Sequence, residues 1–121
     1  MANPQSEHQL DFRFRILKED LNGHAIVMDS CIFIWVGHAR SDFLLFGFGD
    51  QCAFIDGMPT PNNQVFLQSM CTKLCRLFHG KQIYFSTDIG GGETKDPHYW
   101  LKFFEALKTH FDENKQFYRL E

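Results

Sequence analysis

The most reactive side chains in this sequence belong to four cysteines and six histidines. Cys71, Cys75 and His79 are spaced four residues apart, so on a helix they would lie along one row. Thiolate and imidazole groups are zinc ligands, but a structural zinc site takes four ligands, and the chain has no CxxC, HxH or HExxH. The fourth ligand would have to come from Cys31, Cys52 or a distant histidine. We therefore expect reduced thiols packed among apolar side chains, and no metal.

Other patterns with possible chemistry are also incomplete. No cysteine lies in a motif that supplies a catalytic base, and the glycines Gly90, Gly91 and Gly92 lack the GxxxxGK[ST] pattern of a phosphate loop. Asp96 would also place a negative charge beside the phosphate. Four aspartates lie at the ends of predicted strands, where a short carboxylate favours a turn: Asp29, Asp42, Asp50 and Asp56. We expect no enzyme, no catalytic residue and no cofactor.

The composition limits the kinds of partner that the chain is expected to bind. A net charge of −3, from twelve basic and fifteen acidic residues without blocks, gives no electrostatic footprint for nucleic acid or an anionic membrane. Arg13 and Arg15 alternate with Phe12 and Phe14 and could form a platform for bases, but two arginines in an acidic chain are weak support. We expect neither nucleic acid nor membrane as a partner.

The length of the chain and the positions of its cysteines indicate how many domains it forms and in which compartment it lies. The 121 residues, 44% of them hydrophobic, suit one compact domain with its own core. No apolar run approaches the ~18 residues needed to cross a bilayer, and the amino terminus lacks the plan of a secretory signal. Cysteines inside apolar segments suit a reducing compartment, so we expect a cytoplasmic protein, with the nucleus as a second location that would fit.

The central element is the stretch 31–37, Cys-Ile-Phe-Ile-Trp-Val-Gly. It is β-branched, aromatic and too short for a lone helix, so we predict a strand. Side chains alternate along a strand, which places Cys31, Phe33 and Trp35 on one face and the aliphatic residues between them on the other. Both faces are apolar, so both need to be covered.

The remaining segments predict five more strands and two helices. Alternation favours strands at 11–17 and 24–28, joined by a tight turn at Asn22-Gly23. Further strands are expected at 43–48 and 52–56, giving an antiparallel meander, and a sixth at 81–87. Helical periodicity predicts one helix from about residue 62 to Gly80 and one over about 96–114. Residues 1–10 are expected to be a flexible arm, and residues 11–121 a single domain.

Two of these segments carry a resemblance to a known family. The run Asp-Ser-Cys-Ile-Phe-Ile-Trp-Val-Gly at 29–37 and the strand Lys-Gln-Ile-Tyr-Phe-Ser at 81–86, with the order of elements around them, resemble the proteasome assembly chaperone 4 family over roughly residues 10 to 115. The resemblance implies a non-enzymatic α+β domain with a six-stranded antiparallel sheet. It also implies pairing with proteasome assembly chaperone 3 and action on alpha-type subunits of the 20S core particle, chiefly alpha-type subunit five.

A physical argument leads separately to a partner. Two helices shelter one face of a sheet, so the other face of this predicted sheet is available for a dimer partner. We expect Phe33, Trp35, Leu45 and Tyr84 to line that face, and Trp35→Ala to cost ~3 to 5 kcal/mol if the indole is buried. The alternative is a dimeric scaffold domain of the trafficking or GTPase-regulating kind, which would also pair through a sheet.

Overall fold

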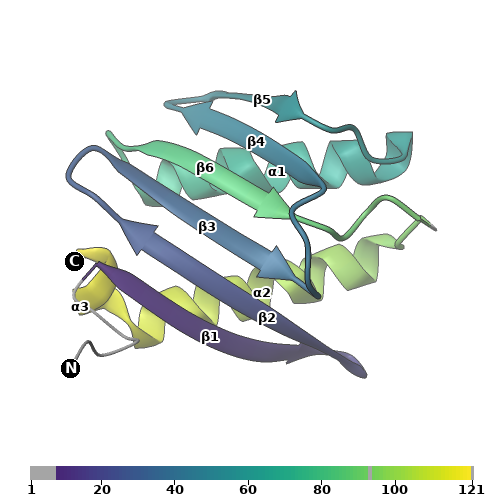
Figure 1. Cartoon of the computed structure of the whole chain (residues 1–121), viewed down its shortest axis with the longest axis horizontal. Coiled ribbons are helices and arrows are strands. Elements are labelled where there is room, and N and C mark those ends of the chain that lie inside the picture. The colour runs from purple at the N-terminus through teal and green to yellow at the C-terminus, as the bar shows by residue number, and fades with distance from the viewer. Residues whose placement is uncertain (1–7, 93, 121) are drawn as a thin grey trace.

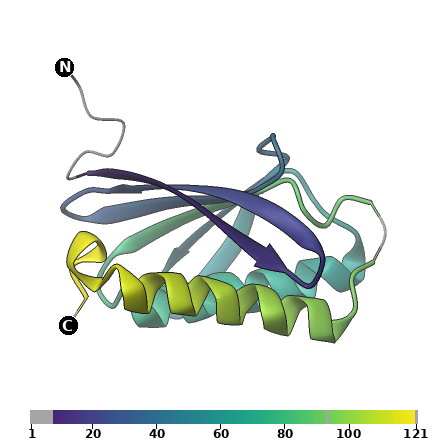
Figure 2. The ribbon, with the colours of Figure 1, turned by 90° about the horizontal axis from the view of Figure 1, so that it is seen from below.

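The computed structural model describes residues 8–92 and 94–120. It consists of two layers, a six-stranded sheet and a pair of long helices, and both helices lie on the same side of the sheet (Figures 1 and 2). No helix in these described ranges is both long enough and apolar enough to cross a membrane. The α+β fold and the placement of the two helices are as predicted.

The sheet differs from the prediction in its topology. The strands are β1 (Gln9–Ile16), β2 (Glu19–Val27), β3 (Cys31–Gly37), β4 (Phe43–Phe48), β5 (Gln51–Asp56) and β6 (Gln82–Thr87). Their order is β1-β2-β3-β6-β4-β5, and every neighbouring pair is antiparallel except β3 and β6. The predicted meander is therefore wrong between β3 and β4. The chain returns from α1 and inserts β6 there, parallel to β3, so the sheet is mixed.

The turn between β1 and β2 also lies elsewhere than predicted. Ile16 pairs with Glu19, and Leu17 takes the left-handed conformation of a tight turn at φ 57°. Gly23 lies inside β2 opposite Phe12, where an added Cβ would be 2.1 Å from the Phe12 ring. This glycine is needed for packing rather than for a turn. β1 also takes in two residues of the predicted 1–10 arm, and residues 1–7 lie outside the described part of the chain.

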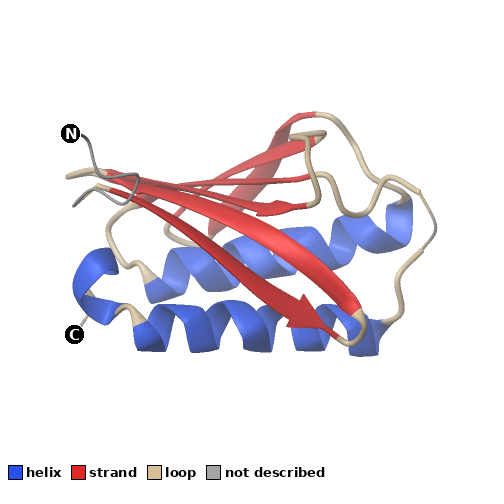
Figure 3. Ribbon diagram, turned by 60° about the horizontal axis from the view of Figure 1, so that its bottom comes forward, coloured by secondary structure: helices blue, strands red, loops and turns tan. Residues whose placement is uncertain are grey.

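The helices are α1 (Pro61–Leu77), α2 (Pro97–Glu113) and the one-turn α3 (Lys115–Tyr118), which was not predicted. Each long helix begins with proline, whose fixed φ suits the first turn. The Asp96 carboxylate caps α2 by accepting a hydrogen bond from the Tyr99 backbone N–H at 2.9 Å. In Figure 3 the two long helices run side by side beneath the strands.

The core lies between the helices and the sheet. Every second side chain of β3 (Ile32, Ile34 and Val36) is fully buried there. α1 contacts β4, β5 and β6, while α2 contacts β1 and supplies Phe103 and Phe111 to the core. The helices thus cover one whole face of the sheet, and each covers its own half.

Candidate functional site: the uncovered face of the sheet

An apolar row crosses the side of the sheet opposite α1 and α2. Residues directly opposite each other on paired strands share a face. Phe33 lies opposite Ile26 on β2 and opposite Tyr84 on β6, and Tyr84 in turn lies opposite Phe46 on β4. The rings of Phe46 and Tyr84 are 5.1 Å apart between centroids. Four adjacent strands therefore contribute to one continuous row.

We call this side of the sheet the uncovered face. Its apolar side chains remain partly open to solvent, and those towards β5 are the most exposed, with Phe48 at 50% and Ile55 at 54%. Ser86 on the same face is fully buried, because its hydroxyl is hydrogen-bonded to Ser41 of the β3–β4 loop. The apolar members of this face are Ile26, Cys31, Phe33, Trp35, Leu44, Phe46, Phe48, Ala53, Ile55 and Tyr84. A contiguous apolar surface of this kind marks a site of interaction with another molecule.

The β1 and β2 part of the same face is polar. Arg15 Nε donates to Asp20 Oδ1 at 2.9 Å, Arg13 Nε donates to Asn22 Oδ1 at 3.1 Å, and the side chain of the neighbouring His24 lies 2.5 Å from an Asp11 carboxylate oxygen. The Arg15 bond lowers the pKa of the exposed Asp20 carboxyl. These pairs suit contact with water. The apolar surface is therefore limited to β3, β6, β4 and β5, together with Ile26 of β2.

Three of the four predicted partner-binding residues lie on the uncovered face: Phe33, Trp35 and Tyr84 are half-buried there. Leu45 does not, because it pairs with Phe85, is fully buried and points toward the helices. Alternation on β4 alone could not relate its two faces to those of β3, because that relation depends on β6 lying between them. For the same reason the prediction missed Phe46.

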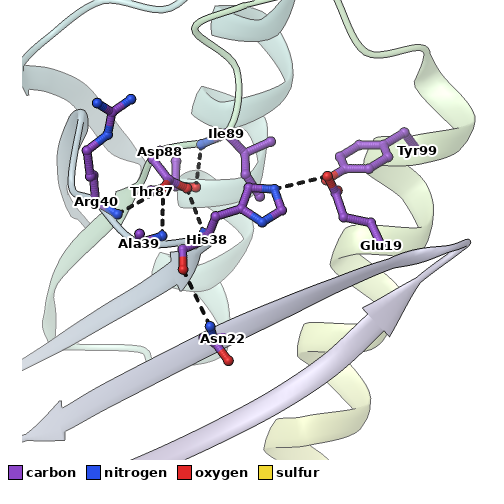
Figure 4. A network of polar contacts seen from close by, with 9 residues as sticks. All are labelled: Glu19, Asn22, His38, Ala39, Arg40, Thr87, Asp88, Ile89 and Tyr99. Carbon is purple, nitrogen blue, oxygen red and sulfur yellow. Dashed lines mark hydrogen bonds and ion pairs between the residues drawn. The ribbon is translucent and has the colours of Figure 1, made fainter.

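The loop from β3 to β4 borders this face and is held by the carboxylate of Asp88, which follows β6. Asp88 accepts hydrogen bonds from the backbone N–H groups of His38, Ala39 and Arg40, each at 2.9 Å (Figure 4). Desolvation acts to raise the pKa of Asp88, but these three bonds outweigh it and leave the pKa lowered. A Cβ on Gly37 would be 2.2 Å from the Asp88 carboxylate, so the glycine that ends β3 is required for this arrangement.

The same loop orients Trp35. The indole Nε1–H donates to the Arg40 carbonyl at 2.7 Å. His38 is held in turn by Glu19, at 3.0 Å from its Nε2, and the Tyr99 hydroxyl donates to the other Glu19 oxygen at 2.5 Å. Burial and this carboxylate raise the pKa of Tyr99. The polar network therefore fixes an aromatic side chain of the uncovered face to the helix layer.

The structure also accounts for the two sequence patterns that could have indicated a chemical site, the cysteine and histidine row and the glycine segment. Cys71 and Cys75 are buried on α1, but His79 lies beyond the end of the helix and is exposed, so the row is broken. Within residues 8–92 and 94–120 no group of three or more suitable side chains is arranged to hold a metal. In the glycine segment, the Gly90 carbonyl accepts from Asn63 Nδ2 at 3.0 Å, so the segment is fixed to the start of α1.

Comparisons with known proteins bear on the fold. No protein-family model matches the chain, and no curated protein matches it significantly. Among solved structures, a chain of the "Crystal Structure of a Novel Chaperone Complex for Yeast 20S Proteasome Assembly" is similar, with a TM-score of 0.63 and 13% sequence identity. The alignment covers 85% of this chain and 98% of that chain. This protein therefore has the fold of a subunit in a yeast complex for 20S proteasome assembly.

Proposed function

We propose that this protein is a non-enzymatic chaperone of 20S proteasome assembly that works as one half of a heterodimer. Its partner would be proteasome assembly chaperone 3, and its client the alpha ring, chiefly alpha-type subunit five. The observation that carries the proposal is the uncovered face, an apolar surface on the central strands that no helix of residues 8–92 and 94–120 covers. The shared fold with a subunit of the yeast chaperone complex supports it.

The physical chemistry of the face favours a protein partner. A specific contact buries more than ~1,000 Å² in total, and each buried apolar Å² contributes ~25 cal/mol before association costs. The Phe33, Tyr84 and Phe46 row supplies aromatic side chains, which dominate the energetics of protein interfaces. A second sheet of the same fold could lie face to face on this one and close both apolar surfaces together.

The proposed action is templating by surface complementarity. The pair would offer a shape that fits one ring subunit and would block wrong neighbours or premature contacts, without covalent chemistry. It would act where proteasomes are assembled, in the cytoplasm and, by the same proposal, in the nucleus. The firmly held β3–β4 loop around Arg40 is a rigid element beside the face and could contribute to recognition of the client.

Pairing is tested by mixing the purified chain with proteasome assembly chaperone 3 and measuring mass in solution by light scattering. The wild-type mixture is expected to give a 1:1 complex. Phe46→Glu, which places a charge in the apolar row, is expected to abolish it. Val65→Glu is the matched control, since Val65 is 65% exposed on α1 in the other layer. Loss of the complex with both variants, or with neither, would contradict pairing through the uncovered face.

The client is tested separately by capture from cell extract. The wild-type pair is expected to retain proteasome alpha-type subunits, and the Phe46→Glu chain to retain none. Retention of a small GTPase or a vesicle coat protein in place of proteasome subunits would instead support the alternative of a trafficking or GTPase-regulating scaffold, and would reject the chaperone role while leaving the pairing result valid.

A further inference from the structure

Three of the four cysteines converge on one position in the core. Gly47 of β4 lies opposite Cys52 of β5 on the covered face of the sheet, and α1 passes above it. A Cβ built on Gly47 would lie 2.4 Å from Cys75 Sγ and 3.0 Å from Cys71 Sγ. The space that any other residue would fill at this position is therefore occupied by sulfur atoms. β4, β5 and α1 together create a cluster of thiols.

The thiols in this cluster differ in access and in acidity. All three are free; Cys52 is partly exposed, whereas Cys71 and Cys75 are buried at 0% and 2% exposure. A hydrogen bond shared with Cys71 lowers the pKa of Cys52, and that bond together with burial raises the pKa of Cys71. Since the thiolate is the reactive form, a reagent from solution meets the more reactive and more accessible thiol at Cys52.

We propose that Cys52 and Cys71 form an oxidation site, at which a small-molecule disulfide converts the two thiols into a disulfide bond between β5 and α1. Geometry brings the three thiols together around Gly47, and access and hydrogen bonding select the pair within them. Cys52 is the only member of the cluster that is open to solvent, and Cys71 is the thiol with which it shares a hydrogen bond. This inference does not depend on the proposed chaperone function.

The reaction balances as thiol–disulfide exchange. The Cys52 thiolate attacks one sulfur of the small disulfide, forming a mixed disulfide and releasing one small thiolate. Cys71 then loses its proton to solvent and attacks Cys52 Sγ, releasing the second small thiolate. The two protein thiols are oxidised, and the small disulfide is reduced to two thiols. Once Cys52 is in the mixed disulfide, Cys71 no longer donates a hydrogen bond to a Cys52 thiolate, and that bond is the largest of the causes that raise the pKa of Cys71.

The sequence allows a direct test by peptide mapping. The folded chain is treated with oxidised glutathione, its remaining thiols are alkylated, and it is digested with trypsin. Cleavage after Arg40, Lys73 and Arg76 places Cys52 and Cys71 together in peptide 41–73 and Cys75 alone in peptide 74–76. We expect peptide 41–73 to lose two hydrogens and carry no alkyl group, while Cys75 and Cys31 remain alkylated.

Other maps would overturn the proposal. A link between peptides 41–73 and 74–76 would show that Cys75 is the partner, and full alkylation of peptide 41–73 would show that no disulfide forms. Preferential reaction of Cys31, which lies on the uncovered face, would show that simple exposure decides reactivity. These results come from the wild-type chain, so they do not depend on whether a variant folds.

Two variants assign the roles within the pair. Cys71→Ser is expected to stop the reaction at the mixed disulfide, so that peptide 41–73 retains glutathione on Cys52. Cys31→Ser, the matched control, is expected to leave the disulfide yield unchanged. If Cys71→Ser forms no glutathione adduct while circular dichroism shows a native spectrum, Cys52 is not the attacking thiol and the proposal fails.

Discussion

The two faces of β3 carry equally apolar side chains in opposite environments. Ile32 and Ile34 are fully buried beneath the helices, whereas Phe33 and Trp35 are only half-buried on the other side. The strand is the same and the neighbouring strands are the same, so the difference comes from the cover alone. The comparison separates two demands on one sheet: one face stabilises the single chain, and the other is suited to association.

The uncovered face is itself divided into a polar part and an apolar part. Its β1 and β2 part carries polar and charged side chains that are already paired with each other and suit contact with water, while its centre carries aromatic rings. A sheet that was simply exposed would be polar across its width. The apolar centre therefore indicates selection for contact rather than for solubility.

The largest effect on stability is expected on the covered face. Phe85→Ala removes a fully buried ring from the middle of the sheet, and should lower the free energy of unfolding by about 3 to 5 kcal/mol. Urea unfolding of the single chain measures this. A cost below about 1 kcal/mol would mean that the helix layer does not pack on the sheet as described.

A smaller loss is expected at the junction of the two faces. Asp88→Ala leaves three backbone N–H groups of the β3–β4 loop without their acceptor, and should cost about 1 to 3 kcal/mol. Because the same loop accepts from the Trp35 indole, tryptophan fluorescence should change as well. The isosteric Asp88→Asn should lose less stability, since its amide oxygen can still accept hydrogen bonds from the loop. Equal losses in both variants would contradict the role of the three bonds.

The covered face should also give a pH dependence through His110. This ring stacks on Phe12 with centroids 3.8 Å apart, and its Nε2 lies 2.6 Å from the Tyr118 hydroxyl. Burial lowers the pKa of His110 to about 4, below the value of about 6.5 in an unfolded chain. Its stabilising contribution is therefore complete above about pH 6.5 and declines as the pH falls toward 4.

Urea midpoints measured at about pH 7 and about pH 4.5 test this dependence. His110→Phe, which keeps an aromatic ring but cannot be protonated, should make the decline smaller. An unchanged decline in that variant would assign the pH dependence to the carboxylates of the chain instead.

The smallest effect on the single chain is expected on the uncovered face. Phe33→Ala should change the free energy of unfolding by about 1 kcal/mol or less, because the ring is already half-solvated. The same substitution should weaken pairing with proteasome assembly chaperone 3 by about 2 kcal/mol or more, as expected for an aromatic residue at the centre of an interface. Calorimetric titration compares the two quantities. A large stability loss with normal pairing would reverse the assignment of the two faces.

Local sequence patterns determined which segments became strands and long helices. The 31–37 strand, the amphipathic stripe of α2 and the apolar character of both faces of the central strand all follow from spacing over a few residues. Together they predicted that one layer of helices would leave one face without cover. This part was accessible because alternation and helical periodicity are local properties of the chain.

The tertiary structure decided how the strands are ordered and therefore which side chains meet. Insertion of β6 between β3 and β4 turned Leu45 toward the helices and placed Phe46 in the apolar row. It also left Trp35 half-buried, so the burial on which the 3 to 5 kcal/mol expectation for Trp35→Ala depended is not present in the single chain. Likewise, only packing brings Cys52 to the thiols of α1. Hydrogen bonds between strands distant in sequence set these relations, and no local period encodes them.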